Sequence, residues 1–411
     1  MSVSKSIRPL IAIACGGTGG HLFPGLAVGE QLLERGCDVT LLISPKEIDQ
    51  QSVKNEREMK VVTLPAVGMT RGHFAEFISG FLASYRAAKK HFRSRPPQAV
   101  LAMGGFTSAP PVLAGRAFHA ATFLHESNVI PGRANRWLAH VVTQAFVGFP
   151  ATAARLHHAN ILCTGTPVRP QFQPSDTGAC RMSLGLDLRR PVLLVMGGSQ
   201  GASGVNDLMI AALPQLVATL PDLQYIHLTG PKDSEKVQAA YSGNGCRAVV
   251  RPFLTEMELA LGAATAAISR SGASSLAEFA AMRVPSILVP YPAAADDHQL
   301  HNALGFTETG AALLLEQGSA TPGQLVDHVA RLIGDAGSRT AMCGALERWD
   351  APRAAARIAE KIVATVEALN WGGRTRPSAS ETGPAARSEK NLMTGRVGWE
   401  DGGVPDSMRT V

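Results

Sequence analysis

Short runs of consecutive apolar residues alternate along the chain with longer stretches in which apolar residues recur every three or four positions. A run is typical of a strand buried on both faces, and the longer spacing is typical of a helix with one buried face. The first run, 10–14, precedes a glycine-rich segment and a helical pattern over 24–35 that ends at Gly36. Further predicted strands occupy 38–43, 99–103, 121–124 and 141–147.

The same pattern begins again in the second half of the chain. Residues 191–196 predict a strand, 197–202 form a second glycine-rich turn, and a helical pattern continues to about Leu220. Alternation of strands and helices predicts a parallel sheet covered on both faces. We therefore expect an α/β protein with two Rossmann-like domains, each built on a doubly wound parallel sheet, that face each other across a cleft. Its remaining strands are expected at 224–229, 264–269 and 286–289.

The boundaries of these domains follow from local composition. We expect the N-terminal domain to cover 1–165 and the C-terminal domain to cover 191–345, joined by a connector over 166–190 that begins with a proline-rich stretch. A C-terminal helix over 346–371 follows. From 372 to 411 the chain is rich in Gly, Pro, Ser, Arg and Glu and has no periodic apolar pattern, which predicts a disordered tail.

Composition narrows the class of protein. The formal net charge of +6 weakly indicates an anionic partner. The six cysteines are scattered and form no C-x-x-C pair, so we expect reduced thiols and no zinc site. The N-terminus lacks the apolar core of a signal peptide, and no apolar run approaches the roughly 20 residues of a membrane helix. We expect a protein that is soluble or bound peripherally to a membrane.

The two glycine-rich turns, 15–21 and 197–202, each lie between a predicted strand and a predicted helix. A helix N-terminus in this position presents free N–H groups to a phosphate. Neither turn continues as a Walker loop. The first also lacks the third glycine of a dinucleotide fingerprint, and no acidic residue follows Ile43, which argues against a nicotinamide cofactor. Each turn alone could serve only to reverse the chain, but one turn in each domain favours a phosphorylated ligand.

Polar residues at the ends of several strands supply candidate chemistry. His21 follows five small residues at a helix start, where a neutral imidazole could accept a hydroxyl proton, although an ordinary core or surface histidine fits the spacing equally well. The segment 269–278 offers small residues for a diphosphate and Glu278 for ribose hydroxyls; a solvent-exposed helix carboxylate is the alternative. Asp296 and Asp297 are disfavoured as metal ligands because adjacent carboxylates point apart in most backbones.

Six motifs, taken in order, resemble those of the MurG family. They are GGTGGHLFPGLA at 16–27, MGGF at 103–106, HESN at 125–128, GTPVR at 165–169, GGSQGA at 197–202 and SRSGA at 269–273. The resemblance covers about residues 9–368 and implies a GT-B fold. It also implies transfer of N-acetylglucosamine from UDP-N-acetylglucosamine to lipid I (undecaprenyl-pyrophosphoryl-N-acetylmuramyl-pentapeptide), giving lipid II for peptidoglycan synthesis, cell shape and cell division.

The resemblance assigns donor-binding roles by position. Glu278 would hold the ribose, Leu254 would lie against the uracil and Gln299 would contact sugar hydroxyls. The chain departs from the family pattern at His298, where the family often has Gln, and at Ser127, where Gln is common. The implied donor-binding residues are Thr18, Gly19, Gly20, Asn128, Arg169, Ser199, Leu254, Ala273, Ser274, Ser275, Leu276, Ala277, Glu278 and Gln299.

The implied reaction is an inverting displacement without a covalent intermediate. His21 is the expected base, and Glu126 is either its competitor or the group that orients it. Loop N–H groups and a helix dipole would offset the charge on the leaving diphosphate, so we expect neither cofactor nor metal. Two alternatives stay open: an isomerase of the UDP-N-acetylglucosamine 2-epimerase kind, and a non-catalytic nucleotide-sugar-binding scaffold.

A stretch of apolar residues at spacing 3-1-3-1-3 predicts one face of a helix and is followed by basic residues at 86, 89, 90, 93 and 95. An apolar face with basic flanks suits docking on anionic lipid, although an ordinary core helix has the same period. The resemblance favours the membrane reading, since the acceptor is a polyprenyl lipid. It implies a location at the cytoplasmic face of the bacterial inner membrane. It also implies contacts with cell-wall and division proteins and no nucleic-acid partner. The predicted membrane patch is Phe74, Phe77, Ile78, Phe81, Leu82 and Tyr85.

Overall fold

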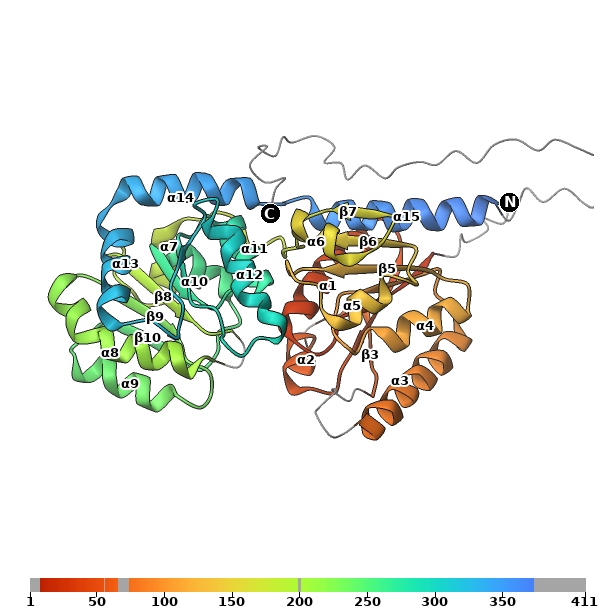
Figure 1. Cartoon of the computed structure of the whole chain (residues 1–411), viewed down its shortest axis with the longest axis horizontal. Helices are drawn as coiled ribbons and strands as arrows, with labels where there is room; N and C mark the ends of the chain where they lie inside the picture. The colour runs from red at the N-terminus through yellow and green to blue at the C-terminus, as the bar shows by residue number, and fades with distance from the viewer. Residues whose placement is uncertain (1–7, 55, 66–73, 199–200, 373–411) are drawn as a thin grey trace, which may run out of the picture.

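The structure, a computed structural model, describes residues 8–54, 56–65, 74–198 and 201–372 and contains two α/β domains side by side (Figure 1). The first has a seven-stranded sheet in the order β3-β2-β1-β4-β5-β6-β7. Its strands are β1 (Leu10–Ala14), β2 (Asp38–Ile43), β3 (Lys60–Thr63), β4 (Ala99–Ala102), β5 (Ala121–Glu126), β6 (Gln144–Val147) and β7 (Ile161–Cys163). Its helices are α1 (Gly19–Glu34), α2 (Glu47–Ser52), α3 (Phe74–Ser94), α4 (Ala109–Ala117), α5 (Arg133–Leu138) and α6 (Pro150–Leu156).

The second domain has a six-stranded sheet in the order β10-β9-β8-β11-β12-β13. Its strands are β8 (Val192–Met196), β9 (Gln224–Leu228), β10 (Ala248–Arg251), β11 (Ala266–Ser269), β12 (Ser286–Leu288) and β13 (Leu313–Leu314). The helices that follow β7 are α7 (Thr177–Ser183), α8 (Ser203–Thr219), α9 (Ser234–Gly243), α10 (Met257–Ala263), α11 (Ala273–Met282), the 3-10 helix η1 (Ala295–Asp297), α12 (His298–Thr307), α13 (Pro322–Gly334), α14 (Ala336–Trp349) and α15 (Ala354–Gly372).

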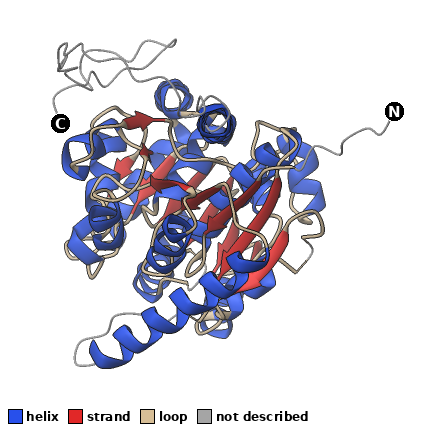
Figure 2. Ribbon diagram, turned by 90° about the vertical axis from the view of Figure 1, so that its right-hand side faces the viewer, coloured by secondary structure: helices blue, strands red, loops and turns tan. Residues whose placement is uncertain are grey.

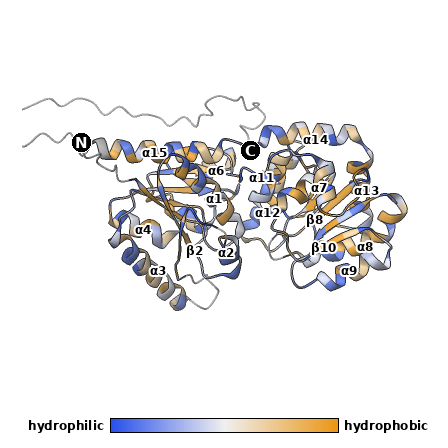
Figure 3. Ribbon diagram, turned by 180° about the vertical axis from the view of Figure 1, so that it is seen from behind, coloured by the Kyte–Doolittle hydropathy of each residue, from blue (hydrophilic) through white to orange (hydrophobic). Residues whose placement is uncertain are grey.

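Strand β1 is apolar throughout because helices cover both faces of its sheet. Successive side chains of β1 point to opposite faces. Ile11 and Ile13 join the core on one face, and Ala12 and Ala14 join the core on the other. Figure 2 shows the strands as twisted sheets between helices, and Figure 3 shows that hydrophobic residues concentrate in them. This double burial is what makes the sequence read as continuous apolar runs.

Each sheet has one switch point at its centre. Both strands that pair with β1, namely β2 and β4, run parallel to it, and the chain continues outward from β1 on one side and from β4 on the other. The strands β8 and β11 hold the same relation in the second sheet. Loops that leave the carboxyl ends of two such neighbours diverge and open a crevice. All the predicted glycine-rich and small-residue turns leave β1, β4, β8 or β11.

The C-terminal helix expected over 346–371 is divided in the structure. Helix α14 ends at Trp349, and α15 begins at Ala354 and lies along the first domain (Figure 1). Its buried side chains Ile358 and Ile362 belong to the core that also contains β1 and α1. The chain therefore crosses between the domains twice, once after β7 and once between α14 and α15. Within the described ranges, no helix combines the length and apolar character needed to cross a membrane.

Helix α1 begins five residues before the expected start at Pro24. Proline is common at the first position of a helix, which is why the pattern favoured that start. In the structure Pro24 lies inside α1, which begins at Gly19 after the N-cap Thr18. Proline has no N–H and cannot donate to the carbonyl four residues earlier. That carbonyl, of Gly20, accepts instead a hydrogen bond from the Ser274 hydroxyl of the other domain at 3.0 Å.

Candidate functional site

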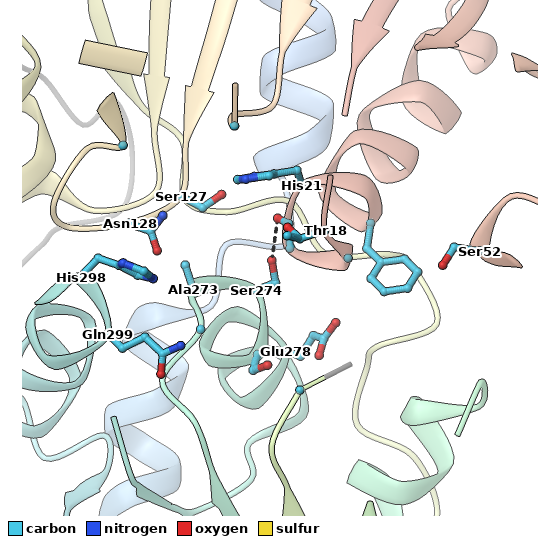
Figure 4. A pocket seen from close by; sticks show the side chains of 18 of the residues that line it. Thr18, His21, Ser52, Ser127, Asn128, Ala273, Ser274, Glu278, His298 and Gln299 are labelled. Atoms are coloured by element: carbon cyan, nitrogen blue, oxygen red, sulfur yellow. Dashed lines mark hydrogen bonds between the residues drawn. The ribbon is translucent and has the colours of Figure 1, made fainter. Parts of the chain in front are cut away.

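A cavity of about 1320 Å³ lies between the two domains, at the switch points of both sheets. His21, Ser127 and Asn128 lie on one wall, and Ala273, Ser274, Glu278, His298 and Gln299 lie opposite (Figure 4). The sequence-predicted residues that line the cavity are Thr18, Gly19, Gly20, His21, Glu126, Asn128, Arg169, Leu254, Ala273, Ser274, Ser275, Glu278 and Gln299. Ser199 lies outside the described residues.

The side chains of Leu276 and Ala277 do not line this cavity. Leu276 has no exposed surface and belongs to the core of the second domain. Both residues line a separate small hollow beside Phe149 and Trp349. A helix turns once every 3.6 residues, so a continuous stretch of α11 cannot present every side chain to one cavity. The assignment of Leu276 and Ala277 to donor binding stays a prediction, and any contact they make with a molecule in this cavity would have to come from their main chain.

His21 projects from the first turn of α1 against the turn that follows β4. An added Cβ at Gly104 would lie 2.8 Å from the His21 Cε1 atom, and Gly104 has a φ of +114°. The two glycines at 104 and 105 are therefore what makes room for the imidazole. Its buried Nδ1 has no hydrogen-bond partner among the described residues.

The protonation state of His21 follows from its surroundings. Burial lowers the pKa of the imidazole, while the charges of Glu126 and Asp49 act in the opposite direction. Burial is the larger effect, since it disfavours the charged form more than the carboxylates favour it. A neutral imidazole can accept a proton, so the site holds a group that is ready to act as a general base.

Glu126 is buried at the end of β5 and its two oxygens accept four hydrogen bonds. Oε1 accepts from the main-chain N–H of Asn128 at 2.9 Å and from its Nδ2 at 3.0 Å. Oε2 accepts from the N–H of Gly132 at 2.9 Å and from Nδ2 of Asn135 at 2.8 Å. A carboxylate has about four acceptor positions. Glu126 therefore holds the loop that carries Asn128, and this geometry favours His21 as the proton acceptor.

Asp49 is a buried residue that sequence reasoning missed. Its Oδ2 accepts hydrogen bonds from the N–H of Gly17 at 2.7 Å and from the hydroxyl of Ser44 at 2.5 Å. It thus fixes the first glycine-rich turn and occupies an N–H that a phosphate would otherwise use. In the second domain, by contrast, the first turn of α11 has no side-chain cap and no acidic residue, so its N–H groups are available to an anion. The role of Asp49 could not be predicted from a motif, because a lone aspartate on a short helix has no distinctive spacing.

Arg169 reaches the cavity from the connector. Its guanidinium lies 4.4 Å from the ring centroid of Phe23 and 5.1 Å from that of Phe172, and its buried Nε has no protein partner among the described residues. Burial raises the pKa of the nearby Glu278 to about 7; Glu258 adds to this rise and Arg169 opposes it. The pair thus offers one cation for a diphosphate and one carboxyl group with a strongly perturbed pKa.

The 3-10 helix η1 and the first turn of α12 bring Asp296 and Gln299 to the cavity. Oε1 of Gln299 accepts from the N–H of Tyr291 at 2.9 Å, and its amide nitrogen points toward the cavity (Figure 4). Asp296 and Asp297 have φ values of 51° and 48°, which is unusual for residues with a side chain. Oδ2 of Asp296 accepts a hydrogen bond from the guanidinium of Arg136 in the first domain at 2.7 Å, and the two charges form an ion pair. In the described ranges, no three His, Cys, Asp or Glu side chains converge as metal ligands would.

The apolar stripe of α3 divides into two parts. Ile78 and Leu82 are 41% and 43% exposed. Phe81 and Tyr85 are half-buried and pack against the core of the first domain, beside α4. Phe77 is also half-buried and its ring centroid lies 6.3 Å from that of Phe81. The side chain of Phe74 lies outside the described residues. The exposed apolar surface of α3 is therefore narrower than the stripe predicts.

Comparisons with known proteins identify the family of both domains. Residues 11–147 match the glycosyltransferase family 28 N-terminal domain, and residues 192–358 match the glycosyltransferase family 28 C-terminal domain. A UDP-N-acetylglucosamine--N-acetylmuramyl-(pentapeptide) pyrophosphoryl-undecaprenol N-acetylglucosamine transferase of Sorangium cellulosum is 33% identical over 96% of this chain and 99% of its own length. A relative of the same name from Xanthomonas campestris pv. campestris is 35% identical over 88% of this chain and 82% of its own length.

Solved structures show the same fold. The crystal structure of Acinetobacter baumannii MurG aligns with a TM-score of 0.67 at 26% identity and covers 87% of this chain and 99% of that one. A putative UDP-N-acetylglucosamine 2-epimerase from Listeria monocytogenes also aligns with a TM-score of 0.67, at 16% identity, over 92% of this chain and 100% of that one. The second likeness shows the fold alone. The expected GT-B arrangement of two parallel-sheet domains is confirmed.

The raised pKa of Glu278 predicts a stability effect. The folded-state value of about 7 exceeds the ordinary 4.5, so the folded protein holds this proton more tightly than the unfolded chain does. Stability is therefore lost as pH rises from about 4.5 to about 7, and the loss is complete above that window. Glu278→Gln removes the carboxyl group and with it this loss of stability. We therefore expect the variant to raise the melting temperature more at about pH 8 than at about pH 5.

Thermal melts of the ligand-free protein measure this difference. Glu316→Gln, which changes an exposed carboxylate in a loop of the same domain, is the matched control and should show no comparable dependence on pH. An equal effect of Glu278→Gln at both pH values would contradict the proton-binding state of this half-buried carboxyl group.

Proposed function

The chain belongs to the MurG family of glycosyltransferases, and from this membership we propose that it transfers N-acetylglucosamine from UDP-N-acetylglucosamine to the C4 hydroxyl of lipid I, giving lipid II for peptidoglycan synthesis. The observation that carries this proposal is the interdomain cavity, which His21 lines together with the first residues of α11. Relatives named for this transfer align with nearly the whole chain, whereas the epimerase shares only the fold. The transferase is therefore favoured over the isomerase and over a non-catalytic scaffold.

His21 supplies the base in the proposed mechanism. It takes the proton of the acceptor hydroxyl as the oxygen attacks the anomeric carbon of the donor sugar. The bond from that carbon to the diphosphate breaks on the opposite face, and UDP leaves with the electron pair. The configuration is inverted in this single displacement, so the protein needs no nucleophile.

The second domain would hold the donor. The free N–H groups of the first turn of α11 and the guanidinium of Arg169 would offset the charge that develops on the diphosphate. Glu278 would accept hydrogen bonds from the ribose hydroxyls, and the amide nitrogen of Gln299 would donate to the sugar. These groups supply positive potential from the chain's own atoms, which supports our proposal that no metal is required.

A coupled assay tests the activity. With UDP-N-acetylglucosamine and a lipid I analogue, we expect UDP release and a product heavier by one N-acetylhexosamine residue in mass spectrometry. Without the analogue, UDP release should fall to background. Release of UDP or formation of a C2 epimer at an undiminished rate without acceptor would instead indicate the isomerase.

The base and the glycines that make room for it can be tested together. His21→Ala should lower kcat by roughly 10²–10⁴-fold with little change in UDP affinity. Gly104→Ala places a methyl group against the imidazole, so displacement of His21 should lower kcat on the order of 10²-fold. In the control Gly36→Ala, a residue with φ of +76° gains a methyl group that nothing within 4 Å contacts. It should cost about 1–2 kcal/mol of stability and leave kcat unchanged.

We also propose that the protein acts at the cytoplasmic face of the bacterial inner membrane, with α3 docked on anionic lipid. Supporting this are the exposed apolar side chains Ile78 and Leu82 and the basic residues that follow them on the same helix. A lipid-linked acceptor requires an approach to the membrane surface. Contacts with cell-wall and division proteins belong to the same proposal.

Co-sedimentation with vesicles containing anionic phospholipid tests this surface. Ile78→Glu plus Leu82→Glu should weaken binding, since it removes apolar area and adds negative charge, and added salt should weaken binding of the unaltered protein. The control is Met182→Glu plus Leu188→Glu, which makes the same charge change at apolar residues of the second domain that are 66% and 50% exposed. Equal binding by both double variants would refute the role of α3.

A further inference from the structure

Asn302 lies on α12 with no exposed surface, at the seam between the two domains. Its Oδ1 accepts from the N–H of Val129 in the first domain at 2.9 Å. Its Nδ2 donates to Oδ1 of Asn128 at 3.0 Å and to the carbonyl of Ser271 at 3.1 Å. One carboxamide thus joins the loop after β5 to the loop that leads into α11. A buried polar side chain is costly unless its hydrogen bonds are made, and here they are made on both sides of the seam.

The main chain fixes which way this amide faces. An N–H group can only donate and a carbonyl can only accept, so Val129 and Ser271 set Oδ1 and Nδ2 of Asn302. The orientation passes on to Asn128, because its Oδ1 accepts from Asn302 and its Nδ2 donates to Glu126 Oε1 at 3.0 Å. The polar atoms of Asn128 are thereby held from both domains at once.

Asn128 lines the cavity and Asn302 does not. Asn302 therefore has no contact with a molecule in the cavity, and its influence passes through Asn128 and through the loop of Ser271. A series of hydrogen bonds connects the wall that carries the proposed base with the start of α11, the helix proposed to hold the diphosphate. This series passes from Glu126 to Asn128, then to Asn302 and to Ser271. It is complete only when the two walls are at the observed separation.

We propose that Asn302 is a positioning residue for sugar transfer: it fixes the orientation of Asn128 and sets the donor loop in register with the wall that carries His21. This inference rests on the proposed function. An amide is the group that fits, because it donates to two oxygens and accepts from one N–H. Aspartate would keep the acceptor and lose both donors, and alanine would lose all three bonds.

A double-mutant cycle tests the inference in the full-length protein with the coupled assay. Asn302→Ala should lower kcat by about 10–100-fold, because the three hydrogen bonds that hold Asn128 and the donor loop in place are lost. The double variant with Asn128→Ala should be little worse than the more impaired single variant, since both act through one unit. Independent, multiplying effects on kcat would overturn the inference.

Two further variants separate positioning from loss of fold. Asn302→Asp, which keeps the shape, should be impaired at least tenfold in kcat; wild-type activity would show that the donated bonds are dispensable and would sink the inference. Ala303→Gly, also buried on α12, is the control: it should lower the melting temperature without lowering kcat. A loss of kcat in Ala303→Gly as large as that in Asn302→Ala would also count against positioning.

The outcomes distinguish the two claims. If the unaltered protein makes no product from the donor and the lipid I analogue, the proposed function fails and this inference fails with it. If the unaltered protein is active and the cycle shows independent effects, the positioning role alone fails.

Discussion

Everything at the cleft depends on the direction of the strands. Because all strands of each sheet are parallel, their carboxyl ends share one edge, and the change of direction at β1/β4 and at β8/β11 opens a crevice at that edge. The two crevices face each other, so loops distant in sequence become walls of a single cavity. Within these walls, carboxylates accept hydrogen bonds from main-chain N–H groups and so fix the loops. Asp49 holds the turn at Gly17, and Glu126 holds the loop of Asn128. The reacting groups are placed by this internal scaffold.

The seam between the domains has two kinds of contact. Away from the cavity, Phe149 of the first domain packs on Phe306 and Trp349 of the second, with ring centroids 6.1 and 5.3 Å apart. At the cavity, the contacts are polar: Ser274 to Gly20, Arg136 to Asp296, and Asn302 to the loop after β5. Water can replace polar bonds at modest net cost, whereas separating the aromatic rings exposes apolar area. The seam is therefore tighter at its apolar end than at the cavity.

The sequence predicted the features that periodicity and chain direction determine. Apolar runs located β1 and β2 at their observed bounds, and strand ends located His21 and Glu278. What it missed arises from contacts between distant residues. Asp49 meets Gly17 across 32 positions, and Asn302 meets Val129 across 173, so neither contact leaves a local pattern. A C-terminal helix was expected, but its packing on the first domain was not. That packing depends on an apolar surface of the first domain, which forms only when distant residues come together.

Pro24 gives the first turn of α1 a property that a regular helix lacks. Any other residue at this position would return an N–H to the Gly20 carbonyl, and the turn would satisfy itself within its own domain. With proline, that carbonyl keeps an unused hydrogen-bonding valence, which the Ser274 hydroxyl fills from across the cleft. A local defect in one helix thus becomes an attachment point for the neighbouring domain. The same proline that makes α1 less regular lets it recognise α11, so domain pairing is encoded within the motif that carries His21.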